Sequence, residues 1–91
     1  MRFLTDGKRH LICLPYSVSN LHLMASSLGI SRNFYHHKNK KTGRLRPHYD
    51  IPLRRKEEIE SLCEFISDRE ITDIINGYIK EIYKTDKIFR K

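Results

Sequence analysis

The segment RFLTDGKRHLICL, residues 2–14, decides the fold, because it predicts a β-hairpin at the start of the chain. Two strand-like runs flank Asp6-Gly7, a dipeptide suited to the positive φ angles of a tight turn. The run from Leu11 to Leu14 is apolar throughout, as expected of a strand covered on both faces. Pro15 then ends the strand, because proline has no N–H to donate to a sheet.

A helix is expected after the hairpin. Its apolar side chains recur at the spacing of one helical face and are Leu21, Met24, Ala25 and Leu28. Ser17 is suited to cap the amino end, because its hydroxyl accepts a hydrogen bond from a free N–H of the first turn. Gly29 suits the left-handed position that often follows a last turn. The helix is therefore predicted to lie between these two capping residues.

The middle of the chain, from residue 30 to residue 52, shows no helical period. The loop-forming residues Asn39, Thr42 and Gly43 interrupt a run of Lys and Arg. We therefore expect two short extended segments, joined by a flexible basic loop at residues 38–46.

A second helix is expected to begin near Leu53. It would carry Ile59, Leu62 and Cys63 on one face. The segment that follows, Glu64 to Ser67, is either the end of this helix or a short strand, and the pattern leaves both open.

A third helix is predicted from Ser67, where Ser67-Asp68-Arg69-Glu70 forms a capping box. Its apolar stripe consists of Ile71, Ile74, Ile75, Tyr78, Ile79 and Ile82. Gly77 inside the stripe costs about 1 kcal/mol relative to Ala, which indicates close packing at that position. The polar tail at residues 85–91 is expected to fray, although Ile88 and Phe89 could dock on the body.

Together these elements predict one small α+β domain over residues 1–91, with an N-terminal β-hairpin and one or two further short strands packed with three helices. The hydrophobic share of 38% and the charged share of 32% are consistent with a folded domain that has a thin core. Cys13 and Cys63 lack C-x-x-C partners, so we expect two reduced, buried thiols, with one long-range disulfide as the alternative. No leader-like or membrane-length apolar run is present, which favours a cytoplasmic protein without a membrane partner.

Positive charge is concentrated in one part of the chain. Residues 31–56 hold nine Lys and Arg against a single acid, Asp50, a balance of +8. The remaining residues hold nine Lys and Arg against ten acids, a balance of −1, so this stretch carries the whole net charge of +7. A concentrated basic patch indicates an anionic partner, whereas a uniform basic surface would indicate only solubility.

An ordered series of motifs runs through the same region. It consists of Leu21-His22, Ala25, Leu28-Gly29, Arg32, Phe34 and the His-Tyr-Asp motif His48-Tyr49-Asp50. This series resembles a domain-of-unknown-function family of short proteins from bacteria and tailed phages, over about two thirds of the chain. The resemblance implies the strand-turn-strand start, a short strand at Glu64 to Ser67 and a bacterial or phage cytoplasm, without implying an activity.

The chain also departs from that family pattern. An Asp pair after the first strand and a Cys-His pair in the second strand are replaced here by Asp6-Gly7 and Cys13-Leu14. Functions that rest on those groups are therefore not implied for this chain. The basic stretch from Lys38 to Arg46 resembles an insertion into the family pattern.

The basic stretch itself predicts a small nucleic-acid-binding protein, with RNA or single-stranded DNA preferred. Lysines and arginines would contact phosphates and release counterions, while aromatic and imidazole rings would stack on unpaired bases. The candidate residues are Arg32, Tyr35, His36, His37, Lys38, Lys40, Lys41, Arg44, Arg46, His48, Tyr49, Arg54 and Arg55. No helix-turn-helix, zinc-finger or RNP motif indicates sequence-specific recognition. In a phage, such a protein could occupy host RNA or the anionic groove of a host enzyme.

Two other functions remain open. One is a protein-binding inhibitor of a host or defence factor, since an acidic protein could fill the same basic patch. The other is a small metal-dependent phosphoesterase, because His48 and Asp50 share a face of an extended segment and could act with Asp6. For the two carboxylates a structural role is the competing interpretation: Asp6 would be a turn residue, and Asp50 would cap the helix that starts past Pro52 or pair with Arg46.

We expect binding rather than catalysis, and no cofactor or structural metal. His10, Cys13, His36, His37 and His48 are potential zinc ligands, but they lack the paired spacings of structural zinc sites. The isoleucine stripe is expected to be core. Any part of it that the small body leaves uncovered would become a homodimer or partner surface.

Overall fold

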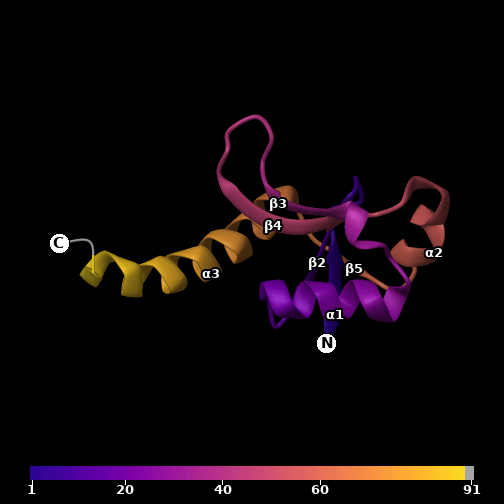
Figure 1. The fold of residues 1–91 in the computed structure, drawn as a ribbon. Helices are drawn as coiled ribbons and strands as arrows, with labels where there is room; N and C mark the ends of the chain where they lie inside the picture. Colours follow the sequence, from indigo (N-terminus) through magenta and orange to yellow (C-terminus); the bar gives the residue numbers. More distant parts are fainter. Residues whose placement is uncertain (90–91) are drawn as a thin grey trace.

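The computed structural model describes residues 1–89, and the side chains of residues 1–82 (Figure 1). It confirms the predicted hairpin: β1 (Arg2–Thr5) and β2 (His10–Leu14) pair antiparallel, with Phe3 opposite Cys13. Gly7 in the turn has φ 78°, a conformation that L side chains rarely adopt. Of the predicted Asp6-Gly7 turn, only Gly7 has a positive φ, and four residues rather than a tight two-residue turn connect Thr5 to His10.

Helix α1 (Val18–Leu28) is also confirmed, with both of its predicted caps. The Ser17 hydroxyl accepts a hydrogen bond of 3.0 Å from the N–H of Asn20. Gly29 adopts φ 70°, and its N–H is directed to the carbonyls of the last turn. The face that bears Leu21 and Met24 is fully buried.

The middle of the chain forms a second hairpin. After the 3-10 turn η1 (Arg32–Phe34), strand β3 (Tyr35–Lys38) pairs antiparallel with β4 (Leu45–Asp50). The loop is shorter than predicted, because Lys38 belongs to β3 and Arg46 to β4. The Asn39 side chain accepts hydrogen bonds from the N–H groups of two loop residues, and Gly43 takes φ 70°.

The last third contains two short elements and one long helix. The 3-10 turn η2 (Leu53–Arg55) leads into α2 (Lys56–Glu60), and α3 spans Asp68–Phe89. Between them, β5 (Glu64–Phe65) pairs parallel with β1, which resolves the open segment as a strand. The capping box at the start of α3 is formed, with reciprocal 3.0 Å bonds between Ser67 and Glu70.

The five strands make one mixed sheet in the order β3-β4-β2-β1-β5. The predicted α+β class is confirmed, with three strands added to the hairpin where one or two were expected. The described helices include none that is long and apolar enough to cross a membrane.

Successive side chains of β4 point to opposite faces of the sheet. The Tyr49 hydroxyl lies 2.7 Å from Nδ1 of His22, so this side chain faces α1. Arg46 faces the opposite way and contacts Asp68 and Thr72 in the first turns of α3. Helix α1 and the start of α3 therefore cover opposite faces.

The core lies between these layers and is fully apolar apart from Thr5 and His48. Its buried apolar members are Leu4, Leu11, Ile12, Cys13, Leu21, Met24, Ala25, Ile30, Tyr49, Ile51, Ile59, Ile71 and Ile75. Cys13 and Cys63 are free thiols, as predicted.

Three packing predictions were wrong or only partly right. Leu62 is 57% exposed, because α2 ends at Glu60 and the chain turns there toward β5. Gly77 has open space where a Cβ would lie, so close packing does not explain it. In the α3 stripe Ile71 and Ile75 are buried, but Ile82 is 45% exposed. The later part of α3 extends past the sheet (Figure 1).

The partner surface expected on the uncovered part of the stripe remains a prediction. The side chains of Ile88 and Phe89 lie outside the described residues, as do residues 90 and 91. Helix α3 continues to Phe89, and the expected fraying of the tail is not tested by this structure.

Candidate functional site

The sheet brings three histidines of three neighbouring strands onto one face. On β4, His48 and Asp50 lie two residues apart and point the same way, as predicted. His10 of β2 is the register partner of Asp50, and His36 of β3 is the partner of His48. All four side chains therefore lie on the face opposite α1.

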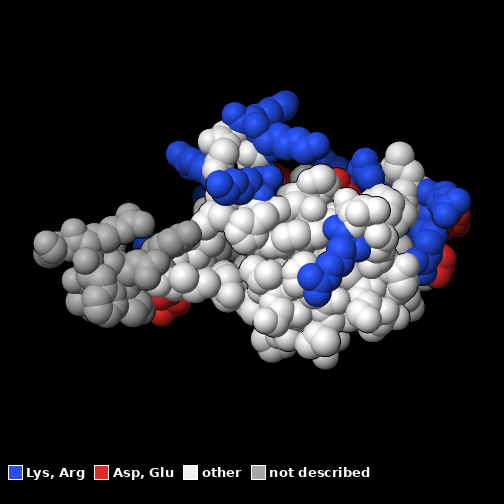
Figure 2. Space-filling view, viewed as in Figure 1, with Lys and Arg blue, Asp and Glu red and all other residues white. Residues whose placement is uncertain are grey.

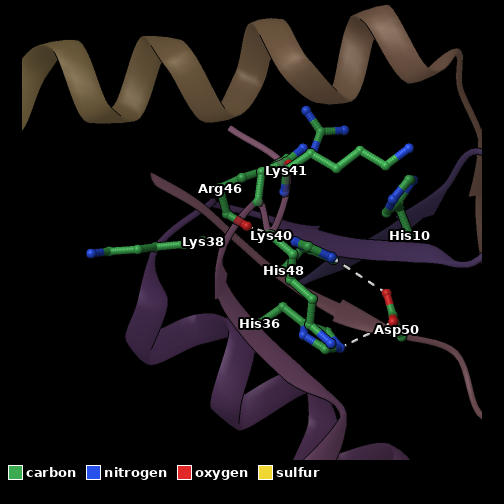
Figure 3. A pocket seen from close by; sticks show the side chains of 9 residues that line it. His10, His36, Lys38, Lys40, Lys41, Arg46, His48 and Asp50 are labelled. Carbon is green, nitrogen blue, oxygen red and sulfur yellow. Dashed lines mark hydrogen bonds and ion pairs between the residues drawn. The ribbon is translucent and has the colours of Figure 1, made fainter. Parts of the chain in front are cut away.

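These side chains line a pocket of about 380 Å³, which the β3–β4 loop borders (Figure 3). Its lining residues are His10, His36, Lys38, Asn39, Lys40, Lys41, Arg46, His48 and Asp50. We refer to this cavity as the histidine pocket. Its volume falls in the range of small-molecule sites, roughly 300–1,000 Å³, and its lining combines three imidazoles with four basic side chains.

Asp50 connects two of the imidazoles (Figure 3). Its Oδ2 lies 3.1 Å from Nε2 of His36, and its Oδ1 lies 3.4 Å from Nε2 of His48. The two rings stack with centroids 5.5 Å apart. Asp50 neither caps a helix nor pairs with Arg46, so both structural interpretations of this residue were wrong.

His48 is held with one nitrogen committed to the backbone. Its Nδ1–H donates a 2.6 Å hydrogen bond to the carbonyl of Arg46. Burial lowers the pKa of His48, and this outweighs the opposing effects of that carbonyl and of Asp50. The ring is therefore neutral at pH 7, and its Nε2 carries a lone pair that faces the carboxylate of Asp50.

His10 is held in a similar way by a different group. Its Nδ1–H donates a 2.6 Å hydrogen bond to Oδ2 of Asp6, whose side chain is almost fully buried. Burial raises the pKa of Asp6, but hydrogen bonds from His10 and from the N–H of Lys8 lower it further than burial raises it. The His10 and His48 rings meet edge to face, with centroids 5.1 Å apart.

Arg46 borders the pocket but is committed to α3. Its guanidinium donates to the Thr72 hydroxyl at 2.8 Å and to Oδ1 of Asp68 at 3.1 Å. Its side chain is only 16% exposed. Arg46 therefore anchors the first turns of α3 to the sheet and contributes to the lining of the pocket.

The predicted nucleic-acid-binding residues do not form one surface. The pocket gathers His36, Lys38, Lys40, Lys41, Arg46 and His48. Arg44 instead lines a smaller cavity of about 170 Å³ beside Thr72. Arg32 lies in η1, and Arg54 and Arg55 lie in η2, where Arg55 pairs with Glu58.

The aromatic candidates are on the other face of the sheet. Tyr49 has no exposed surface, so the prediction that its ring stacks on a base was wrong. Tyr35 is half-buried against it, and its hydroxyl lies 2.6 Å from Nδ1 of His37. His37 is exposed but points away from the pocket that His36 lines.

Sequence reasoning missed the contributions of His10 and Asp68. His10 was considered only as a zinc ligand, because nothing local indicates that β2 pairs with β4. The alternation of His48 and Asp50 identified half of the site. The other half depends on strand register, which is a long-range property of the fold.

One group among the described residues has metal-ligand spacing: Asp6, His10 and Asp68, with ligand atoms within 4.8 Å of one another. The atoms of this group already have protein partners, including the Arg46 cation on Asp68. A divalent cation would have to displace or oppose that guanidinium. Cys13 is buried in the core and takes no part in the pocket, so the five potential zinc ligands are not assembled.

No family model, curated protein or solved structure matches this chain. The resemblance to the bacterial and phage family with the His-Tyr-Asp motif therefore stays a prediction. The geometry of the histidine pocket is the basis for any functional proposal.

Proposed function

We propose that the protein binds single-stranded nucleic acid, with the phosphate backbone on the β3–β4 hairpin and one phosphate in the histidine pocket. The observation that supports this most is the state of Lys38, Lys40 and Lys41. All three are pocket lysines, and among the described residues none forms an ion pair.

Three basic residues elsewhere are paired with acids. Arg2 pairs with Glu64, Arg55 with Glu58 and Lys56 with Glu60. In Figure 2, Lys and Arg gather over the β3–β4 loop with little acid beside them, whereas the group near α2 lies among acids. Unpaired cations around a cavity favour binding of an anion, because each contact releases counterions from a phosphate backbone.

Single strands fit this surface better than a duplex. Helix α1 has no Lys or Arg. The part of α3 whose side chains are described, residues 68–82, has four acids against Arg69 and Lys80, so neither presents a basic face to a major groove. The basic surface is instead a hairpin beside a pocket. An isolated phosphate and its sugar can enter such a pocket, whereas a base-paired helix cannot.

Fluorescence polarisation with labelled single-stranded RNA, single-stranded DNA and duplex DNA tests the proposal over a range of salt concentrations. The triple variant K38Q/K40Q/K41Q should bind more weakly than wild type. Its salt slope should fall by about 2, since each lost single-strand phosphate contact contributes about 0.7.

The matched control is R2Q/R69Q/K80Q, which removes the same charge from exposed positions outside the pocket. It should retain the wild-type slope. Equal losses in both variants would show that only net charge matters, and the proposal would fail. Absence of binding to any single strand at low salt would also overturn it.

A further inference from the structure

The histidine pocket contains two imidazoles that each have one nitrogen committed and one available. His48 donates from Nδ1 to the Arg46 carbonyl, and His10 donates from Nδ1 to Asp6. Both bonds are 2.6 Å long, so they fix the ring orientations. Nε2 is then the atom that each ring can offer to a ligand. Imidazoles held in this way are the usual groups for general acid–base catalysis.

Among the described residues, none donates a proton to Nε2 of His48. In the neutral ring its lone pair faces Oδ1 of Asp50 at 3.4 Å, so two acceptors oppose each other across the wall of the pocket. A hydroxyl placed between them would donate to one of the two. This arrangement indicates a ligand that carries a hydroxyl as well as the phosphate that the lysines attract.

We propose that the histidine pocket cleaves single-stranded RNA by attack of a ribose 2′-hydroxyl on the adjacent phosphodiester, with His48 as general base and His10 as general acid. The inference rests on the proposed binding of nucleic acid and narrows it to RNA. DNA has no 2′-hydroxyl, so DNA would bind without reacting.

The reaction balances with the groups present. The 2′-oxygen forms a bond to phosphorus while its proton passes to Nε2 of His48. The bond from phosphorus to the 5′-oxygen breaks, and that oxygen takes a proton from Nε2 of His10. The products are a 2′,3′-cyclic phosphate and a 5′-hydroxyl, and the two rings exchange their protons with solvent afterwards.

Other pocket residues would support this step. Lys40 and Lys41 lie beside the histidines and would neutralise the charge that develops on the phosphoryl oxygens. Asp6 is a positioning residue, because among the described residues its carboxylate bonds to the His10 ring and to the backbone N–H groups of Lys8 and His10. Since the two imidazoles move both protons, the step proposed here uses no bound cation.

The test is incubation of the full chain with a short single-stranded RNA in the presence of EDTA, with products identified by mass spectrometry. Fragments ending in a 2′,3′-cyclic phosphate are expected. The DNA of the same sequence and the 2′-O-methyl RNA should bind but remain intact, because neither can supply the nucleophile.

The variants H48N and H10N remove Nε2 and keep an amide N–H near the position of Nδ1. Each should lower the cleavage rate by roughly 100-fold or more, which is the usual contribution of one acid or base. Affinity for the 2′-O-methyl RNA should stay within about twofold, since no phosphate contact is lost. That binding also serves as the check that each variant is folded, and His10, at 31% exposure, tolerates substitution more easily than buried His48.

The matched control is H22N, a histidine on α1 that contacts Tyr49 on the other face of the sheet. It should cleave at the wild-type rate. Equal cleavage by wild type, H10N and H48N would identify a contaminating nuclease and overturn the inference, as would complete loss of cleavage in EDTA. Binding without cleavage would overturn the inference and leave the proposed function intact, whereas absence of binding would overturn both.

Discussion

At the scale of single residues, burial changes the chemistry of several side chains. The thiols of Cys13 and Cys63 are shielded from water, and this raises the pKa of each to about 11. Nearby Glu60 adds to the effect at Cys63. Only the thiolate reacts readily with alkylating reagents, so both residues are expected to be inert in the folded protein.

The corresponding prediction concerns thiol reactivity. At pH 8, roughly one thiol in a thousand is ionised when the pKa is about 11, against about one in four for a free cysteine. Both residues should therefore react with an aromatic disulfide reagent far more slowly in the native protein than in urea. Rapid reaction of Cys13 without denaturant would contradict its burial.

The burial of His48 leads us to expect that the stability of the protein depends on pH. Burial lowers its pKa in the folded state below the usual value of 6.5, so the unfolded chain takes up a proton first as the pH falls. The contribution of His48 to the free energy of unfolding is therefore fully present above about pH 6.5. It is lost as the pH falls from there to the lowered pKa of the folded state. His22, whose pKa is lowered by burial and by Arg32, acts in the same direction.

Urea denaturation at neutral pH and near pH 5.5 measures this effect. Wild type should be less stable at the lower pH, and H48N should lose less of its stability over that interval. A stability that rises on acidification would show that His48 is charged in the folded state.

At the scale of elements, local signals predicted the fold and long-range pairing determined the site. Asp6-Gly7, Ser17 and Gly29 act on neighbouring residues, and the hairpin and α1 appeared where they indicated. Strand β5 has only two residues, and only its pairing with β1 identifies it as a strand. The sequence could not show that β2 lies beside β4, so it could not bring His10 to His48 and Asp50.

Tyr49 is an instructive error at the same scale. Its place between His48 and Asp50 made it a candidate for base stacking, yet alternation on a strand sends it to the opposite face. The two-residue alternation along β4 correctly placed His48 and Asp50 on one face. The same alternation places Tyr49, which lies between them, on the other face. Whether that neighbour is buried depends on α1, which packs there.

The contacts of Arg46 with α3 lead to a prediction about how this helix is attached to the sheet. Replacing Arg46 with Met removes two charge-assisted hydrogen bonds and leaves Asp68 without its guanidinium partner. We expect a loss of about 1–3 kcal/mol in the free energy of unfolding, measured by urea denaturation. The control R55M breaks a more exposed pair and should cost less than about 1 kcal/mol. Equal costs would contradict the anchoring role.

At the scale of the whole molecule, the charge is more localised than its count suggests. The basic stretch of residues 31–56 is divided by the fold into the hairpin beside the pocket and the separate η2 group, where Arg55 is paired. Only the first group combines unpaired cations with a cavity. The partner is therefore expected to contact one side of the protein.

An affinity pull-down from bacterial lysate, with and without nuclease, distinguishes the main alternatives. Retained nucleic acid is expected, with no stoichiometric protein left after nuclease treatment. One protein that stays bound in equal amount after nuclease would instead support the inhibitor function, because its affinity would not depend on nucleic acid.

The most direct test of the central claim is a titration of the ¹⁵N-labelled protein with a short 2′-O-methyl RNA, followed by amide chemical shifts. The largest changes are predicted in β3, β4, their loop and His10, the elements around the histidine pocket. Amides of α1 and of η2 should change little. Changes centred on η2 or α1, or no changes at low salt, would contradict the account.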